Sequence, residues 1–182
     1  MAVNWNSGLM RWKPHVDASG KSYSLSHLHP FRFTLPVTRS NDQVMELAVY
    51  VGFAMHCFAR KIEADDPKDM VYSDDREKRT FCLERYALSK DLPEIVRGLV
   101  SAKCGFAKDD NFVTINVSKE RHYGVFFNAK KWESGAGEKG ILLVIQSAYE
   151  LSPKKDLSMK GSIRFARLLE LIWDGTKPKK PR

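Results

Sequence analysis

Residues 44–60 carry the most regular pattern of apolar and polar positions in the chain. Every second residue from Met45 to Cys57 is apolar, which places seven apolar side chains in succession at a spacing of two. Such alternation is typical of a β-strand that buries one face and exposes the other. We therefore predict a long strand over residues 44–60, with Cys57 on its buried face and His56 and Arg60 on its polar face.

A second strand is predicted just before this one. Apolar and polar residues alternate over residues 31–38, and Pro36 places the strand at an edge of the sheet or marks its end. The polar residues 40–42 indicate a turn, so the two strands form a predicted hairpin. Residues 63–79 combine mixed charges with few apolar side chains, which predicts an exposed loop, and residues 80–86 follow as a short strand.

A helix is expected to begin at Asp91 and to end near residues 103–105. Asp91 and Glu94 have the spacing of a capping box, and Pro93 suits the first turn of a helix. Both features are signals of a helix start.

The second half of the chain predicts a meander and a closing helix. Three strands are expected over residues 112–117, 122–131 and 141–151, joined by polar or glycine-rich turns. A last helix is predicted over residues 162–173. Its inward-facing residues are Phe165, Leu168, Leu169 and Ile172.

Together these elements predict an α+β fold, in which two helices pack on an antiparallel β-sheet of five to six strands. We expect a single domain over residues 30–175, because a chain of 182 residues can bury one core of ordinary size. Residues 1–29 lack a sustained period and are interpreted as an extended N-terminal arm, with Trp5 and Trp12 docking it onto the body. Residues 176–182 form a basic, flexible tail whose prolines exclude a helix.

The composition of the chain indicates its cellular location, and the net positive charge is unevenly distributed. With 43% hydrophobic and 29% charged residues, the chain is typical of soluble globular proteins. No stretch approaches the roughly 20 apolar residues of a membrane-spanning helix, and residues 1–25 lack the pattern of a secretory signal. We therefore expect a cytoplasmic protein with no membrane partner. Residues 153–182 carry a net charge of +6 out of the total of +8, so the body is nearly neutral.

Metal and cofactor motifs are missing from the sequence. Cys57, Cys82 and Cys104 lie 25 and 22 positions apart, whereas metal sites use ligands in closely spaced pairs. The spacing therefore favours reduced structural thiols and predicts no metal site. The glycine-rich run 134–140 lacks the ending of a phosphate loop and does not lead into a helix. We expect no cofactor.

Histidine, arginine and tyrosine side chains near strand ends are the candidates for chemistry. His56 and Arg60 would lie about 13 Å apart on the polar face of a regular strand, and His122 and Tyr123 begin the second meander strand. Cleavage of RNA by its own 2′-hydroxyl needs only a base, an acid and cationic support for the phosphate. These four residues are the predicted catalytic set. The alternative is a half-exposed sheet face with ordinary solvated polar residues.

Basic side chains provide a predicted nucleic-acid surface. Alternation along the second meander strand places His122, Phe126, Asn128 and Lys130 on one face and Tyr123 on the other. The tail either contacts nucleic acid through a salt-sensitive attraction or acts as a solubilising end. The predicted nucleic-acid contacts are Lys61, Arg121, Lys130, Lys177, Lys179, Lys180 and Arg182.

Four strings in the sequence carry a resemblance to a known family. They are HCFAR at 56–60, RYALSKDLP at 85–93, YGVFF at 123–127 and LVIQSAY at 143–149. Together they resemble an uncharacterised family of small bacterial proteins found on prophages and other mobile elements, with similarity over roughly residues 30–152. The resemblance implies no activity and no catalytic residues. More loosely, the succession of helix, meander and helix is similar to RelE-type toxin ribonucleases, a likeness of layout alone.

Two functions from different classes follow as hypotheses. The first is a bacterial mobile-element protein that binds RNA or DNA, as an RNA-cleaving toxin or a defence factor. The alternative is a non-catalytic module that binds another protein through a sheet edge or through the N-terminal arm. Neither the oligomeric state nor an enzymatic activity follows from the sequence.

Overall fold

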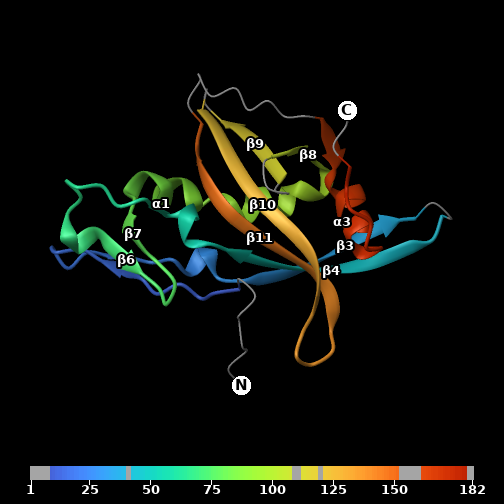
Figure 1. Ribbon diagram of the computed structural model, residues 1–182, viewed down its shortest axis with the longest axis horizontal. Coiled ribbons are helices and arrows are strands. Elements are labelled where there is room, and N and C mark those ends of the chain that lie inside the picture. The colour runs from blue at the N-terminus through green and yellow to red at the C-terminus, as the bar shows by residue number, and fades with distance from the viewer. Residues whose placement is uncertain (1–8, 40–41, 108–111, 119–120, 152–160, 180–182) are drawn as a thin grey trace.

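The computed structural model describes residues 9–39, 42–107, 112–118, 121–151 and 161–179. Within these residues the chain has three α-helices and three β-sheets, which confirms the predicted α+β class (Figure 1). The largest sheet of this described part has seven strands, more than predicted. In spatial order they are β12 (Ser162–Arg164), β8 (Lys103–Phe106), β9 (Phe112–Ser118), β10 (Arg121–Glu133), β11 (Lys139–Glu150), β4 (Val44–Phe53) and β3 (Phe31–Thr38).

The hairpin and the meander form as the sequence predicts. β3 and β4 are antiparallel and in continuous register from Phe31↔Val51 to Thr38↔Val44, with β3 at the edge of the sheet. β9, β10 and β11 follow one another as antiparallel neighbours. The sheet is mostly antiparallel, as predicted, and departs from that pattern where β11 pairs with β4 in parallel.

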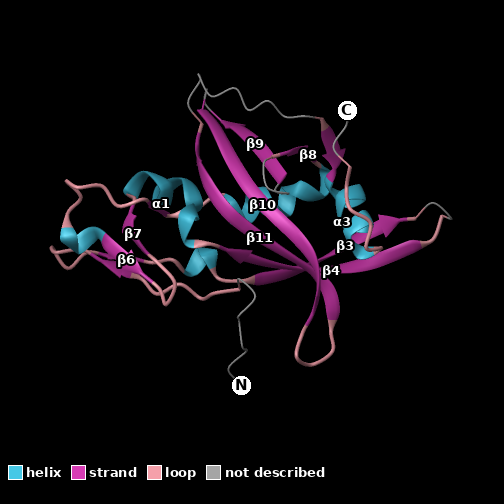
Figure 2. Cartoon of the chain, viewed as in Figure 1, coloured by secondary structure: helices cyan, strands magenta, loops and turns pink. Residues whose placement is uncertain are grey.

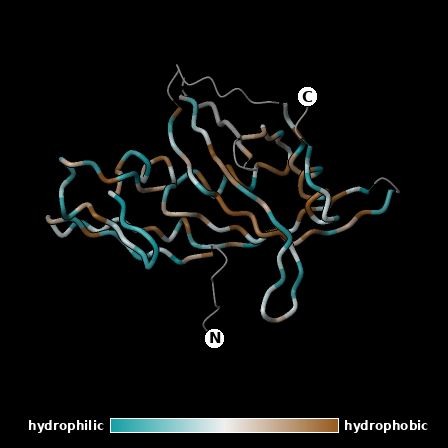
Figure 3. Tube along the Cα trace, in the orientation of Figure 1, coloured by the Kyte–Doolittle hydropathy of each residue, from teal (hydrophilic) through white to brown (hydrophobic). Residues whose placement is uncertain are grey.

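This parallel pair lies inside the sheet, one strand from the β3 edge. Residues 141–145 read ILLVI, and all five are buried. A continuous apolar run is typical of a parallel strand covered on both faces. One face packs against the main core, and the other is covered by a small cluster in which Leu9 contacts Leu142 and Val144. Figure 3 shows hydrophobic segments gathered where β4, β10 and β11 meet.

The predicted long strand over residues 44–60 is too long. β4 ends at Phe53, and a 3₁₀ turn, η2 (Met55–Cys57), follows. The amide of Ala54 donates to the carbonyl of Ile145, after which Cys57 bonds back to Ala54 and the chain turns. Met55 and Cys57 are buried all the same, so burial rather than strand geometry accounts for the last part of the apolar alternation.

A small second sheet follows this turn. It contains β5 (Ala59–Arg60), β7 (Lys78–Phe81) and β6 (Val71–Ser73), and a ribbon of β1 (His15–Val16) and β2 (Ser22–Tyr23) lies on the same side of the molecule (Figure 2). The prediction of an exposed loop over 63–79 is therefore wrong in part, since this stretch includes η3 (Lys68–Met70) as well as β6 and β7. Tyr72 in β6 is buried, which the charge-rich composition of this stretch did not indicate.

The helices also differ from their predicted bounds. α1 (Leu83–Ser89) occupies most of the predicted strand 80–86. α2 (Leu92–Gly98) starts where expected, but Asp91 makes no side-chain cap, and the helix gives way to η4 (Leu99–Ser101) and then β8.

The closing helix is shorter than predicted at its N-terminal end. Residues 162–164 are strand β12, paired with β8, and α3 (Phe165–Trp173) follows. Its predicted inward face is confirmed. Three of the four residues are buried and the fourth packs against the core: Phe165, Leu168, Leu169 and Ile172.

Residues 9–29 pack against the rest of the protein. Trp12 is buried, and its indole N–H donates to the carbonyl of Phe53 at 2.9 Å. A ring nitrogen of His27, which lies in η1 (Ser26–Leu28), lies 2.9 Å from the hydroxyl of Ser89. Trp5, which was also predicted to dock, lies outside the described residues. None of the described helices is long and apolar enough to cross a membrane.

The structure lets us predict a contrast between two glycines of the β10–β11 hairpin. A Cβ on Gly140 would lie 2.6 Å from the carbonyl oxygen of Ala48 and 2.7 Å from the ring of Tyr50, whereas a Cβ on Gly135 would meet nothing within 4 Å. Because the backbone cannot yield cheaply, Gly140→Ala should lower the free energy of unfolding by about 1–3 kcal/mol in urea denaturation. Gly135→Ala is the matched control and should change it by less than about 0.5 kcal/mol. Equal stabilities for the two variants would contradict this packing.

Candidate functional site

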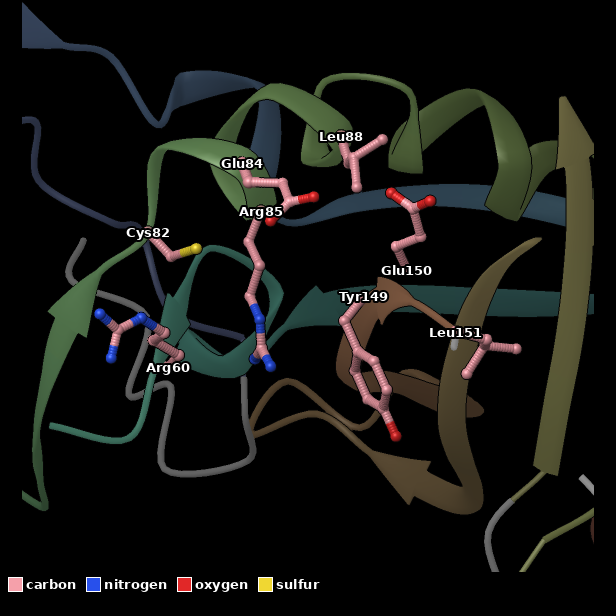
Figure 4. Close-up of a pocket in the computed structure, with 8 residues that line it drawn as sticks. All are labelled: Arg60, Cys82, Glu84, Arg85, Leu88, Tyr149, Glu150 and Leu151. Carbon is pink, nitrogen blue, oxygen red and sulfur yellow. The ribbon is translucent and has the colours of Figure 1, made fainter. Parts of the chain in front are cut away.

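A cavity of about 420 Å³ opens beside the turn that follows β4. Its walls come from β5, from the start of α1 and from the end of β11, so it lies where the two larger sheets meet. Figure 4 shows the Arg85 side chain extending from α1 toward the gap between Arg60 and Tyr149. The lining residues are Arg60, Cys82, Glu84, Arg85, Leu88, Tyr149, Glu150 and Leu151. We call this cavity the Arg85 pocket.

Arg85 is the central group of the pocket. Its Nη1 donates to the carbonyl oxygens of His56 at 3.0 Å and of Ala59 at 2.9 Å, and its guanidinium lies 5.1 Å from the ring centroid of Tyr149. None of the ion pairs formed between described residues involves Arg85. The side chain is half-buried and held in place, and no carboxylate of the described residues forms an ion pair with it.

An aromatic pair continues the pocket onto the sheet. Tyr149 stacks on Phe126 with ring centroids 5.3 Å apart and planes 16° apart. Both rings are partly exposed. The guanidinium, the phenol ring and the phenyl ring therefore form one row across the end of β11 and the neighbouring part of β10, and flat surfaces of this kind stack well on planar ligands.

Arg60, in contrast, is bound within the protein. Its guanidinium forms an ion pair with Asp66 and lies 3.5 Å from Glu63. Hydrogen bonds from the Thr80 hydroxyl, the Glu63 amide and Arg60 lower the pKa of Asp66 to about 2. The carboxylate stays ionised at any physiological pH, so Arg60 contributes shape to the pocket more than free charge.

His56 lies beside the pocket and not among its lining residues. Its Nε2 is 3.0 Å from a carboxylate oxygen of Glu77, which in turn accepts a hydrogen bond from Arg79 at 2.6 Å. Burial and the nearby Arg79 lower the pKa of His56, and Glu77 opposes that shift. The imidazole is therefore neutral at pH 7, the form in which a histidine can accept a proton.

The prediction that His56 and Arg60 share one strand face is wrong. They lie in η2 and β5, with a change of chain direction between them, because β4 ends at Phe53. Each also has its own acidic partner, Glu77 for His56 and Asp66 for Arg60.

His122 and Tyr123 face opposite sides of the large sheet, as alternation along β10 predicts. His122 is exposed, and its carbonyl accepts the amide of Leu151 at the margin of the pocket. Tyr123 is buried on the core side, its hydroxyl has no hydrogen-bond partner among the described residues, and burial raises its pKa. A catalytic role for these residues stays a prediction.

The predicted basic contacts are spread over the molecule. Lys61, Lys177 and Lys179 are exposed, and Lys130 is exposed on the same sheet face as Phe126. Arg121 begins β10, paired with Ser118. Lys180 and Arg182 lie outside the described residues.

The cysteines are free thiols in the structure. Burial raises the pKa of Cys57 and of Cys104 to about 12, and the Cys57 thiol donates to the carbonyl of Ile145. Cys82 lines the Arg85 pocket. In the described part of the chain, no group of three or more His, Cys, Asp or Glu residues is placed to hold a metal ion.

The predicted catalytic set omitted two residues of the pocket and a third that adjoins it. Arg85, Tyr149 and Phe126 do not stand out by composition or period, but each lies in one of the four strings that carry the family resemblance. The structure brings these strings together, since Arg85 contacts the His56–Arg60 turn and Tyr149, and Tyr149 stacks on Phe126. The four strings were therefore the signal in the sequence that could have pointed to these residues.

The fold and the pocket thus define an α+β protein with a guanidinium-centred cavity at a sheet junction. Comparison with protein families shows that the chain belongs to the YjaZ family, which it matches over residues 15–173. This match confirms the expected membership of a little-characterised family and extends it beyond residues 30–152. No curated protein and no solved structure matches the chain.

The two neighbours of His56 should move its pKa in opposite directions. NMR titration of the wild-type imidazole should give a pKa below 6.5, because burial and Arg79 disfavour the charged form. Arg79→Gln should raise this value and Glu77→Gln should lower it. A wild-type pKa above 6.5 would show that the pair with Glu77 dominates, and pKa shifts of the same sign in both variants would contradict the opposed effects of Arg79 and Glu77.

Proposed function

We propose that this protein binds single-stranded RNA and that the Arg85 pocket holds one of its nucleotides. The observation that supports the proposal most is the Arg85 guanidinium, half-buried and without a direct ion pair to another described residue. A fixed cation at the side of a cavity, with no direct ion pair to a described residue, favours an anionic group, and guanidinium groups bind phosphate well.

The surroundings of Arg85 offer groups for the other parts of a nucleotide. Phe126, partly exposed and stacked on Tyr149, offers an aromatic surface on which a base stacks, which is the usual mode of single-strand recognition. Glu84 lines the same pocket and offers carboxylate oxygens to a ribose hydroxyl. A 2′-hydroxyl is present in RNA and missing from DNA, so this acid favours RNA.

The sheet edges give less support to the alternative, a protein-binding module. Edge strand β3 carries Pro36, which cannot donate a ladder hydrogen bond, and β12 has only three residues. Strands of these kinds are poor templates for pairing with another chain. We therefore rank RNA binding first.

Arg85→Ala should weaken binding of a fluorescently labelled single-stranded RNA by roughly tenfold or more, because charged hydrogen bonds contribute about 1.5–3 kcal/mol. Arg97→Ala is the matched control, since Arg97 also donates to a carbonyl and lies over an aromatic ring, Phe31, outside the pocket. Fluorescence anisotropy at fixed salt measures both.

The same assay tests the tail. Removal of residues 176–182 should leave Arg85-dependent binding in place, although the total affinity should fall and its salt dependence become weaker. Equal binding by wild type and Arg85→Ala, or complete loss on tail removal, would sink the proposal.

RNA cleavage, as in a toxin or defence factor, is our second proposal, and it rests on the neutral His56 oriented by Glu77 beside the pocket. Purified protein incubated with total RNA should produce discrete fragments that disappear in His56→Ala. His122→Ala tests the second predicted histidine in parallel. RNA that stays intact with the wild-type protein under all conditions would contradict cleavage, and only the binding proposal would remain.

A further inference from the structure

The face of the large sheet that carries Phe126 has a second aromatic and cationic cluster at its other end. Arg32 on β3 lies over the ring of Tyr50 on β4, 5.5 Å from its centroid. The Tyr50 ring contacts Trp132 on β10, with centroids 4.7 Å apart. Tyr50 and Trp132 are half-exposed and Arg32 is exposed. We call these three residues the Tyr50 cluster.

The fold fixes the Tyr50 cluster in place. Tyr50 packs closely on Gly140, where no side chain intervenes, and its hydroxyl donates to Glu138 at 2.9 Å. On the side toward the centre of the sheet, Leu9 packs with Leu142 and Val144 against the cluster. The rings therefore do not rely on a ligand for their positions.

Strand β10 connects the Tyr50 cluster to the Arg85 pocket. Alternate residues share one face of a strand, so Phe126, Asn128, Lys130 and Trp132 form a single row. This row contains one cation, Lys130, and no acid. Its ends are about 20 Å apart at the usual rise of a strand.

We propose that a single-stranded RNA runs along this row, with one base at Phe126 and Tyr149 and another at the Tyr50 cluster. This inference rests on the proposed RNA binding and adds a second contact site and a minimum ligand length. An aromatic surface with a guanidinium stands at each end, and a lysine lies between them, which suits a ligand with repeating bases and phosphates. A single nucleotide cannot reach both ends.

The test compares a labelled 12-nucleotide poly(U) RNA with a labelled dinucleotide. The wild-type protein should bind the longer RNA more tightly. Arg32→Ala and Trp132→Ala should each weaken its binding by about tenfold and leave dinucleotide binding unchanged. Arg32 is exposed, so its variant keeps the test valid if Trp132→Ala fails to fold. Arg164→Ala, at an exposed arginine in edge strand β12, is the matched control and should change neither affinity.

Two results would overturn the inference in distinguishable ways. If Arg85→Ala abolishes binding but Arg32→Ala and Trp132→Ala leave the affinity for the 12-nucleotide RNA unchanged, the pocket stands and the second contact fails. If the wild-type protein binds neither RNA, the proposed function fails together with its extension.

Discussion

The parallel pairing of β4 with β11 is the constraint on which the rest of this structure depends. It joins the N-terminal hairpin to the meander and makes one seven-stranded sheet from the described strands. The buried run Ile141–Ile145 supplies the apolar surface for both faces of the sheet at this point. Because Ile145 also accepts the amide of Ala54, the pairing sets where β4 ends and where the chain turns into η2.

That turn creates the site. Residues 56–60 would continue a strand if β4 extended further, and Arg85 would then have no pair of carbonyl groups to bind. Instead, the guanidinium holds the turn through His56 and Ala59 and lies against Tyr149, so one side chain has a structural role and the proposed binding role. Loss of Arg85 removes both a hydrogen-bonded support for the turn and a charge that has no ion pair among the described residues. The stability of that variant therefore has to be measured beside its binding.

Much of the fold was predictable because burial leaves a period in the sequence. The hairpin, the meander, the inward face of α3 and the alternation along β10 all follow from spacings of two or of three to four. The end of β4 could not be predicted in this way, because Met55 and Cys57 stay buried after the chain leaves the strand. For the site, parity correctly separated His122 from Tyr123, but Arg85 and Tyr149 meet only through tertiary contacts between segments about 60 residues apart. The periodicity within a single segment does not predict such a tertiary contact.

Ultraviolet crosslinking of the full chain to single-stranded RNA, followed by mass spectrometry of the crosslinked peptides, tests the central claim most directly. The account predicts crosslinks at Tyr149 and Phe126, the aromatic pair beside Arg85, and their loss in Arg85→Ala while the folded state persists by circular dichroism. Crosslinks confined to the basic tail, or an unchanged pattern in Arg85→Ala, would contradict it.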